Sequence, residues 1–141
     1  MTPYYFNIDQ INVIIDPTDP HKSVTHRVSL FEFDFQDSDV LSISTIEHIG
    51  TGDYNLPIDD CREALLKILN QSKSCLITFP IGYNLLLDRF IFLNNFPSNI
   101  IINIVYRSRY FNDWHVTTDF KYLLKLKYGP QWANGIVVIE K

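Results

Sequence analysis

The chain has 141 residues, enough for one domain that buries about two-thirds of its unfolded surface. With 46% hydrophobic residues, 20% charged residues, a net charge of −4 and no cluster of lysine and arginine, a direct nucleic-acid partner is not expected. No uncharged apolar run approaches the ~18 residues that span a membrane, and no signal-peptide pattern opens the chain. Cys61 and Cys75 fall inside predicted elements, which favours buried free thiols in a cytoplasmic protein.

The first third of the chain predicts strands. The β-branched run Ile11–Asp16 stops before Pro17, and the residue before a proline avoids the helical region. Val24–Phe35 partly alternates apolar and polar residues, which is typical of a strand with one solvated face. Val40, Leu41 and Ile43 then predict a short strand in the middle of a sheet, which ends in the polar loop Ser44–Gly50.

The remainder alternates helices and strands. The clearest helix covers Asp60–Asn70, whose apolar residues recur at the spacing of one helical face and whose first turn is acidic. The other predicted elements are a strand at Ser74–Phe79, a helix at Leu85–Phe96, a strand at Asn99–Arg107, a helix at Thr118–Tyr128 and a strand at Gly135–Glu140. This order predicts a single α/β domain over residues 1–141, with helices on the faces of the sheet and a parallel strand–helix–strand crossover.

The chemically capable residues gather after two of these strands. Ser44, Thr45, Glu47 and His48 follow the first, and Gly82-Tyr83-Asn84 follows Ser74–Phe79. Ligands of open α/β sheets bind outside the carboxyl ends of the strands, so these loops are the candidate site. The alternative is structural: Glu47 caps a turn, His48 packs under the sheet, and the second loop is an ordinary turn. The histidines show no closely spaced ligand pattern, so no metal is expected.

The two loops resemble those of class I S-adenosylmethionine-dependent methyltransferases. The likeness rests on Ser42-Ile-Ser-Thr-Ile-Glu-His-Ile-Gly50 and Thr78-Phe-Pro-Ile-Gly-Tyr-Asn84, which are similar to the turns after the family's fourth and fifth strands. The resemblance implies a Rossmann-like, mostly parallel sheet flanked by helices, with the last strand antiparallel beside the fifth. The nearest likeness is to a branch linked to sugar and polysaccharide metabolism, which implies a small hydroxylated acceptor.

The resemblance also implies a cofactor site for S-adenosylmethionine. Asp16 would bind the two ribose hydroxyls, and Ser29 stands where many relatives carry an aspartate that contacts the adenine. Ser44 and Thr45 would contact the cofactor from the other loop. The structural alternatives are that Asp16 only begins a turn and that Ser29 is an exposed serine.

Catalysis and acceptor binding would fall to the remaining loop residues. Histidine is the side chain whose unperturbed pKa suits a general base, so His48 is the candidate base, and Glu47 would orient its imidazole or bind a substrate hydroxyl. Gly82, Tyr83 and Asn84 would border the acceptor pocket.

The family's glycine-rich cofactor loop has no counterpart here, since all five glycines lie elsewhere. The resemblance therefore implies a domain truncated at its N-terminus, with cofactor binding weak or lost. The chain would compensate for the missing strand with Tyr4–Ile8, by direct pairing of the flanking strands, or as a homodimer. The expected function is that of a methyltransferase-like protein, and the alternative is a non-catalytic binding or oligomerisation protein on the same scaffold.

Overall fold

The computed structural model describes residues 11–52, 60–108, 113–119 and 134–141. The chain divides into two compact units, residues 1–34 and residues 35–141, and each is described by itself. The predicted helix at Thr118–Tyr128 and the Tyr4–Ile8 segment lie largely or wholly outside the described residues.

Residues 11–34 form turns rather than the two predicted strands. Their one β-type contact is a parallel bridge between Ile15 and His26. The Asp16 carboxylate accepts hydrogen bonds from the backbone N–H groups of Thr18 and Asp19, at 2.8 and 2.9 Å. Such side-chain bonds to nearby backbone compete with strand pairing. The strands predicted at Ile11–Asp16 and Val24–Phe35 are therefore wrong.

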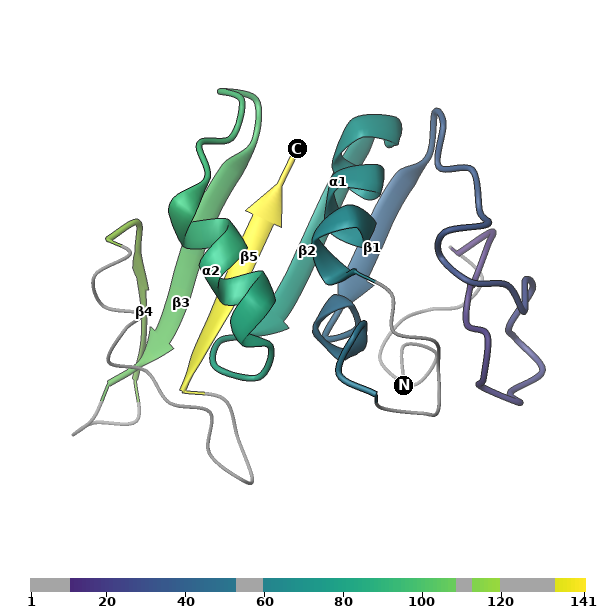
Figure 1. The fold of residues 1–141 in the computed structure, drawn as a ribbon, viewed down its shortest axis with the longest axis horizontal. Coiled ribbons are helices and arrows are strands. Elements are labelled where there is room, and N and C mark those ends of the chain that lie inside the picture. Colours follow the sequence, from purple (N-terminus) through teal and green to yellow (C-terminus); the bar gives the residue numbers. More distant parts are fainter. Residues whose placement is uncertain (1–10, 53–59, 109–112, 120–133) are drawn as a thin grey trace. The chain divides into compact units, whose positions relative to one another are not determined.

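The second unit is built on a five-stranded sheet (Figure 1). Its strands are β1 (Asp39–Ile43), β2 (Ser74–Pro80), β3 (Ile101–Arg107), β4 (Trp114–Thr117) and β5 (Gly135–Glu140). They are arranged in the order β1-β2-β5-β3-β4. The helices of the described residues are α1 (Cys61–Gln71), α2 (Leu85–Leu93) and a single 3-10 turn at Ile46–His48.

The strand directions contradict the expected Rossmann-like, mostly parallel sheet. Among the strands of the described residues, only β1 and β2 pair in parallel, whereas β2 with β5, β5 with β3, and β3 with β4 are all antiparallel. The last strand does run antiparallel to both neighbours, but its insertion between β2 and β3 removes a parallel pairing there. The short strand β4 adds a further antiparallel pair that was not predicted. The sheet is therefore mixed, with mostly antiparallel pairings.

Helix α1 forms where it was predicted, with a cap and an apolar face. The side chain of Asp60 accepts a hydrogen bond from the backbone N–H of Arg62, which satisfies one of the free donors of the first turn. All five residues at the predicted helical spacing are buried: Cys61, Ala64, Leu65, Ile68 and Leu69. Both cysteines are free thiols, as predicted. Helix α2 ends at Leu93, three residues before the predicted end.

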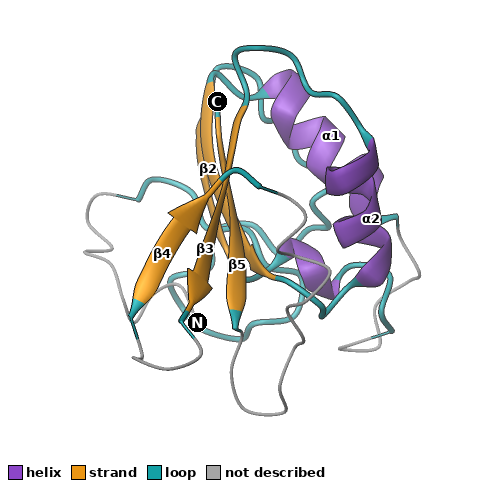
Figure 2. Cartoon of the chain, turned by 90° about the vertical axis from the view of Figure 1, so that its left-hand side faces the viewer, coloured by secondary structure: helices purple, strands orange, loops and turns teal. Residues whose placement is uncertain are grey.

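Both helices cover the same face of the sheet (Figure 2). The sheet residues Ile77, Ile104, Val137 and Ile139 have no exposed surface and form the core with the buried helix side chains. The strands β1 and β2 are parallel neighbours, so they end at the same edge of the sheet. The loops that follow these two strands therefore lie side by side. In the part of the chain that is described, no helix is long and apolar enough to cross a membrane.

Candidate functional site

The loop after β1 turns sharply at Ser44. This residue has φ of 48°, in the left-handed region that non-glycine residues seldom adopt. The backbone N–H of Ser44 still donates to the carbonyl of Thr78 at 2.8 Å, which extends the β1–β2 pairing by one residue. Ile46 is completely buried and anchors the 3-10 turn that follows. The turn aims Glu47 into the protein and leaves His48 at the surface.

Glu47 is a buried carboxylate, with 1% of its surface exposed. The hydroxyl of Ser44 donates a short hydrogen bond to its Oε1 atom. Within the described residues, its Oε2 atom is buried and accepts no hydrogen bond. Burial raises the pKa of Glu47, and the hydrogen bond from Ser44 and the nearby His48 oppose that rise. Such a group ties the loop to the protein interior and is the kind of perturbed acid that often marks a functional site.

His48 joins the first loop to the second. Its Nδ1 atom lies 3.0 Å from the hydroxyl of Tyr83, and the two rings meet edge to face with centroids 4.8 Å apart. Its Nε2 atom lies 3.7 Å from Oε1 of Glu47. The side chain of His48 is 23% exposed, so solvent and small molecules can reach it. His48 thus contacts Tyr83 through one ring nitrogen and Glu47 through the other.

Asn84 fastens the two loops together. Its side-chain amide donates to the carbonyls of Glu47 and Ile49, at 3.0 and 3.1 Å. Its side-chain oxygen accepts from the N–H groups of Leu86 and Leu87, which makes it the N-cap of α2. All of these groups are engaged within the protein and Asn84 is buried. Its geometry is that of a structural clamp, and the predicted contact with an acceptor stays a prediction.

The loop after β2 depends on Gly82 and on an acid that the sequence analysis did not propose. Gly82 has φ of 86°, and its N–H donates to Oδ2 of Asp88 at 2.8 Å. Asp88 is buried, and burial raises its pKa to about 6 although the Gly82 N–H opposes the rise. The sequence offered one sign of it, because Asp88 is an acid in the first turn of a mostly apolar helix that follows a Pro-x-Gly turn.

The residues proposed to bind S-adenosylmethionine are each engaged in their own turn. Oδ1 of Asp16 accepts from Thr18 and Asp19, and the hydroxyl of Ser29 accepts from the N–H of Phe31.

Ser44 and Thr45 are also used locally. Ser44 donates to Glu47, and the hydroxyl of Thr45 donates to the carbonyl of Ile43 at 3.1 Å. The contacts of these four residues fit turn formation rather than a cofactor cradle, and S-adenosylmethionine stays a prediction from the resemblance. Among the described residues, no three histidine, cysteine, aspartate or glutamate side chains are grouped to hold a metal ion.

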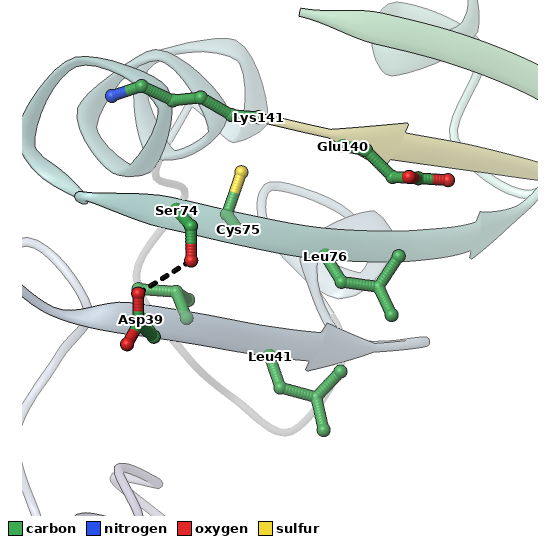
Figure 3. Close-up of a pocket in the computed structure, with 8 residues that line it drawn as sticks. Asp39, Leu41, Ser74, Cys75, Leu76, Glu140 and Lys141 are labelled. Carbon is green, nitrogen blue, oxygen red and sulfur yellow. Dashed lines mark hydrogen bonds between the residues drawn. The ribbon is translucent and has the colours of Figure 1, made fainter.

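A separate hollow of about 460 Å³ lies at the other end of β1 and β2 (Figure 3). Its polar and charged lining residues are Asp39, Ser74, Cys75, Glu140 and Lys141. Ser74 donates to Asp39 at 2.6 Å, and the ammonium of Lys141 is turned away to the last carbonyls of α1. The hydroxyl of Ser74 and the ammonium of Lys141 are thus engaged in contacts within the protein. We take the cluster of Ser44, Glu47, His48, Tyr83 and Asn84 as the candidate site and call it the strand-end cluster.

No family model, curated protein or solved structure matches this chain.

Proposed function

We propose that this chain is a methyltransferase-like protein whose strand-end cluster binds a small hydroxylated molecule such as a sugar, with S-adenosylmethionine binding weak or lost. One observation carries the proposal. The hydrogen bond between Tyr83 and His48 joins the two loops on which the resemblance rests into one polar surface at the carboxyl ends of parallel strands.

The groups of the cluster suit a hydroxyl ligand. The Tyr83 hydroxyl and a neutral His48 imidazole can each donate and accept a hydrogen bond, as a sugar hydroxyl does. Both side chains are partly exposed, so a ligand can reach them. Glu47 lies beside His48, with its Oε1 atom 3.7 Å from Nε2, and can hold the imidazole in place. Such a site would bind the kind of hydroxylated molecule that a methyltransferase modifies, whether or not this chain catalyses the methyl transfer.

Calorimetric titration of the full chain tests this proposal. The titrants are neutral monosaccharides, and S-adenosylmethionine in a separate arm. We expect a sugar to bind to the wild type and to bind at least about tenfold more weakly to Tyr83→Phe, because one hydrogen bond to the ligand is lost. Tyr106→Phe is the matched control, since Tyr106 also stacks near a histidine, His115, but on β3 and outside the cluster.

The titration with S-adenosylmethionine distinguishes a methyltransferase from a non-catalytic binding protein. Sugar binding without detectable S-adenosylmethionine binding supports a binding protein on this scaffold. If both ligands bind and the sugar becomes methylated, the cofactor site is retained and the chain is an enzyme. If no sugar binds at millimolar concentration, the proposed function is wrong.

A further inference from the structure

The two faces of the sheet differ in what covers them. The helices α1 and α2 lie against one face of the sheet (Figure 2), whereas several large apolar residues that the strand register assigns to the opposite face are exposed. We call this second surface the open sheet face. It is defined by six large apolar residues with 40% to 67% of their surface exposed: Leu41, Ile43, Leu76, Ile101, Trp114 and Val116.

Apolar residues occupy outward positions where a solvated sheet would carry polar ones. Ile101 and Val116 lie on the same face of the sheet, because Ile101 and Val105 share one face of β3 and Val105 pairs with Val116 on β4. Leu41 and Leu76 are directly paired across β1 and β2, and Figure 3 shows their side chains pointing the same way. Exposed large apolar residues gathered on one face of a sheet are typical of an interaction site.

Two opposite charges lie on the same face at its two ends. Glu140 pairs with Ile101 at one end of β3, and Arg107 lies at the other end of that strand, one residue beyond the pair of Tyr106 with Gly135. Ile101 and Arg107 are six positions apart in the extended strand, so roughly 20 Å separates them. Among the described residues, neither Glu140 nor Arg107 forms an ion pair with another side chain. The face is therefore apolar with an acidic end and a basic end.

This arrangement is self-complementary, and we propose that the open sheet face binds a second copy of this chain. A two-fold axis that runs midway between the two packed sheets, parallel to their planes and perpendicular to the strands, exchanges the two ends of β3. It sets Arg107 of one protomer against Glu140 of the partner subunit, and the same contact forms a second time by symmetry. Two packed sheets lie about 10 Å apart, a gap that an arginine and a glutamate can bridge. Trp114 and Val116 would be buried near the paired charges, where aromatic and apolar anchors strengthen an interface.

Sedimentation velocity on the full chain over a range of concentrations tests the dimer. We expect a concentration-dependent dimer that Val116→Lys weakens by at least about tenfold, because it buries an unpaired charge in the interface. Leu93→Lys is the matched control, since Leu93 is an exposed leucine at the end of α2 and lies outside the open sheet face. This control should leave the dimer unchanged.

Charge reversal tests the orientation. Arg107→Glu and Glu140→Arg should each weaken the dimer, because each places like charges together at both contacts. The double variant should restore most of the lost affinity. A protein that stays monomeric at every concentration overturns the proposal and means that another part of the chain or a different protein covers the face. A dimer that the charge reversals leave unchanged overturns it as well.

Discussion

The hydroxyl of Tyr83 lies 3.0 Å from Nδ1 of His48, although 35 residues separate the two in the sequence. The contact exists because β1 and β2 are parallel neighbours, so the loops that leave their carboxyl ends start side by side. The buried cap Asn84 then holds the second loop against the first. The strand-end cluster is therefore a product of the one parallel pair in an otherwise antiparallel sheet.

Replacing Tyr83 by phenylalanine tests the contact itself. The substitution keeps the ring and removes the hydroxyl that meets His48. We expect a loss of about 0.5–1.5 kcal/mol in the free energy of unfolding, the usual value for one hydrogen bond, and a changed environment for His48. Urea unfolding measures the first effect, and NMR of the imidazole nitrogens measures the second. Unchanged His48 resonances would contradict the contact.

Asn84→Ala should be more destabilising than the change at Tyr83. It removes both the helix cap and the bonds to the carbonyls of Glu47 and Ile49, so we expect a loss of about 1–3 kcal/mol in urea unfolding. Asn84→Asp is the informative control, because it keeps the cap acceptor and removes the two donors. If the alanine variant were as stable as the wild type, Asn84 would not be a clamp.

The buried carboxyl group of Asp88 should make the free energy of unfolding depend on pH. Its pKa of about 6 in the folded protein is above the ordinary value of 3.8, because burial disfavours the charged form. The unfolded chain therefore loses this proton first. As the pH rises from about 4 to about 6, the contribution of Asp88 to stability is lost, and above that window it stays lost. Urea unfolding at a series of pH values measures the slope.

Asp88→Asn should flatten that slope. The asparagine oxygen can still accept the hydrogen bond from Gly82, but the side chain no longer ionises. Glu47 has a raised pKa for the same reason and contributes to the slope in the same direction, so Glu47→Gln should flatten it further. A slope that neither substitution alters would show that these carboxyl groups titrate normally.

Gly82→Ala tests the backbone of the second loop. A φ of 86° strains any residue with a Cβ atom, and we expect a loss of about 1–2 kcal/mol in the free energy of unfolding. Gly52→Ala is the control, because Gly52 has φ of 80° and an added Cβ there would meet no atom within 4 Å. Both variants should lose stability, but only Gly82→Ala should shift the His48 resonances. Equal effects on His48 would contradict the role of this turn.

The sequence predicted the elements whose stabilising contacts are local or strongly periodic. Helix α1 formed with its cap at Asp60 and its expected buried face, and β2 and β5 are nearly continuous apolar runs that formed as strands. The strand predictions within residues 11–34 were wrong. The β-branched and aromatic composition favours strands, but side chains such as Asp16 form hydrogen bonds with nearby backbone instead. Strand β4 was missed because its four residues are mostly exposed and take their partner from β3.

The candidate site was partly predictable for the same reason. Glu47, His48 and Tyr83 were identified from their position after predicted strands, and the structure brings them together. The roles of Asn84 and Asp88 depend on which backbone groups of another segment lie nearby, and a sequence pattern does not contain that information. The sheet order was also beyond the pattern, since nothing local places β5 between β2 and β3.

If the strand-end cluster binds a small hydroxylated molecule, the ring nitrogens of His48 lie within the binding site and should respond to the ligand. NMR titration of the full chain with the monosaccharide that binds best should shift the His48 nitrogens, and leave those of His26 and His115 in place. In Tyr83→Phe the same titration should require a higher sugar concentration. Sugar binding that leaves the His48 nitrogens unshifted would contradict binding at the strand-end cluster.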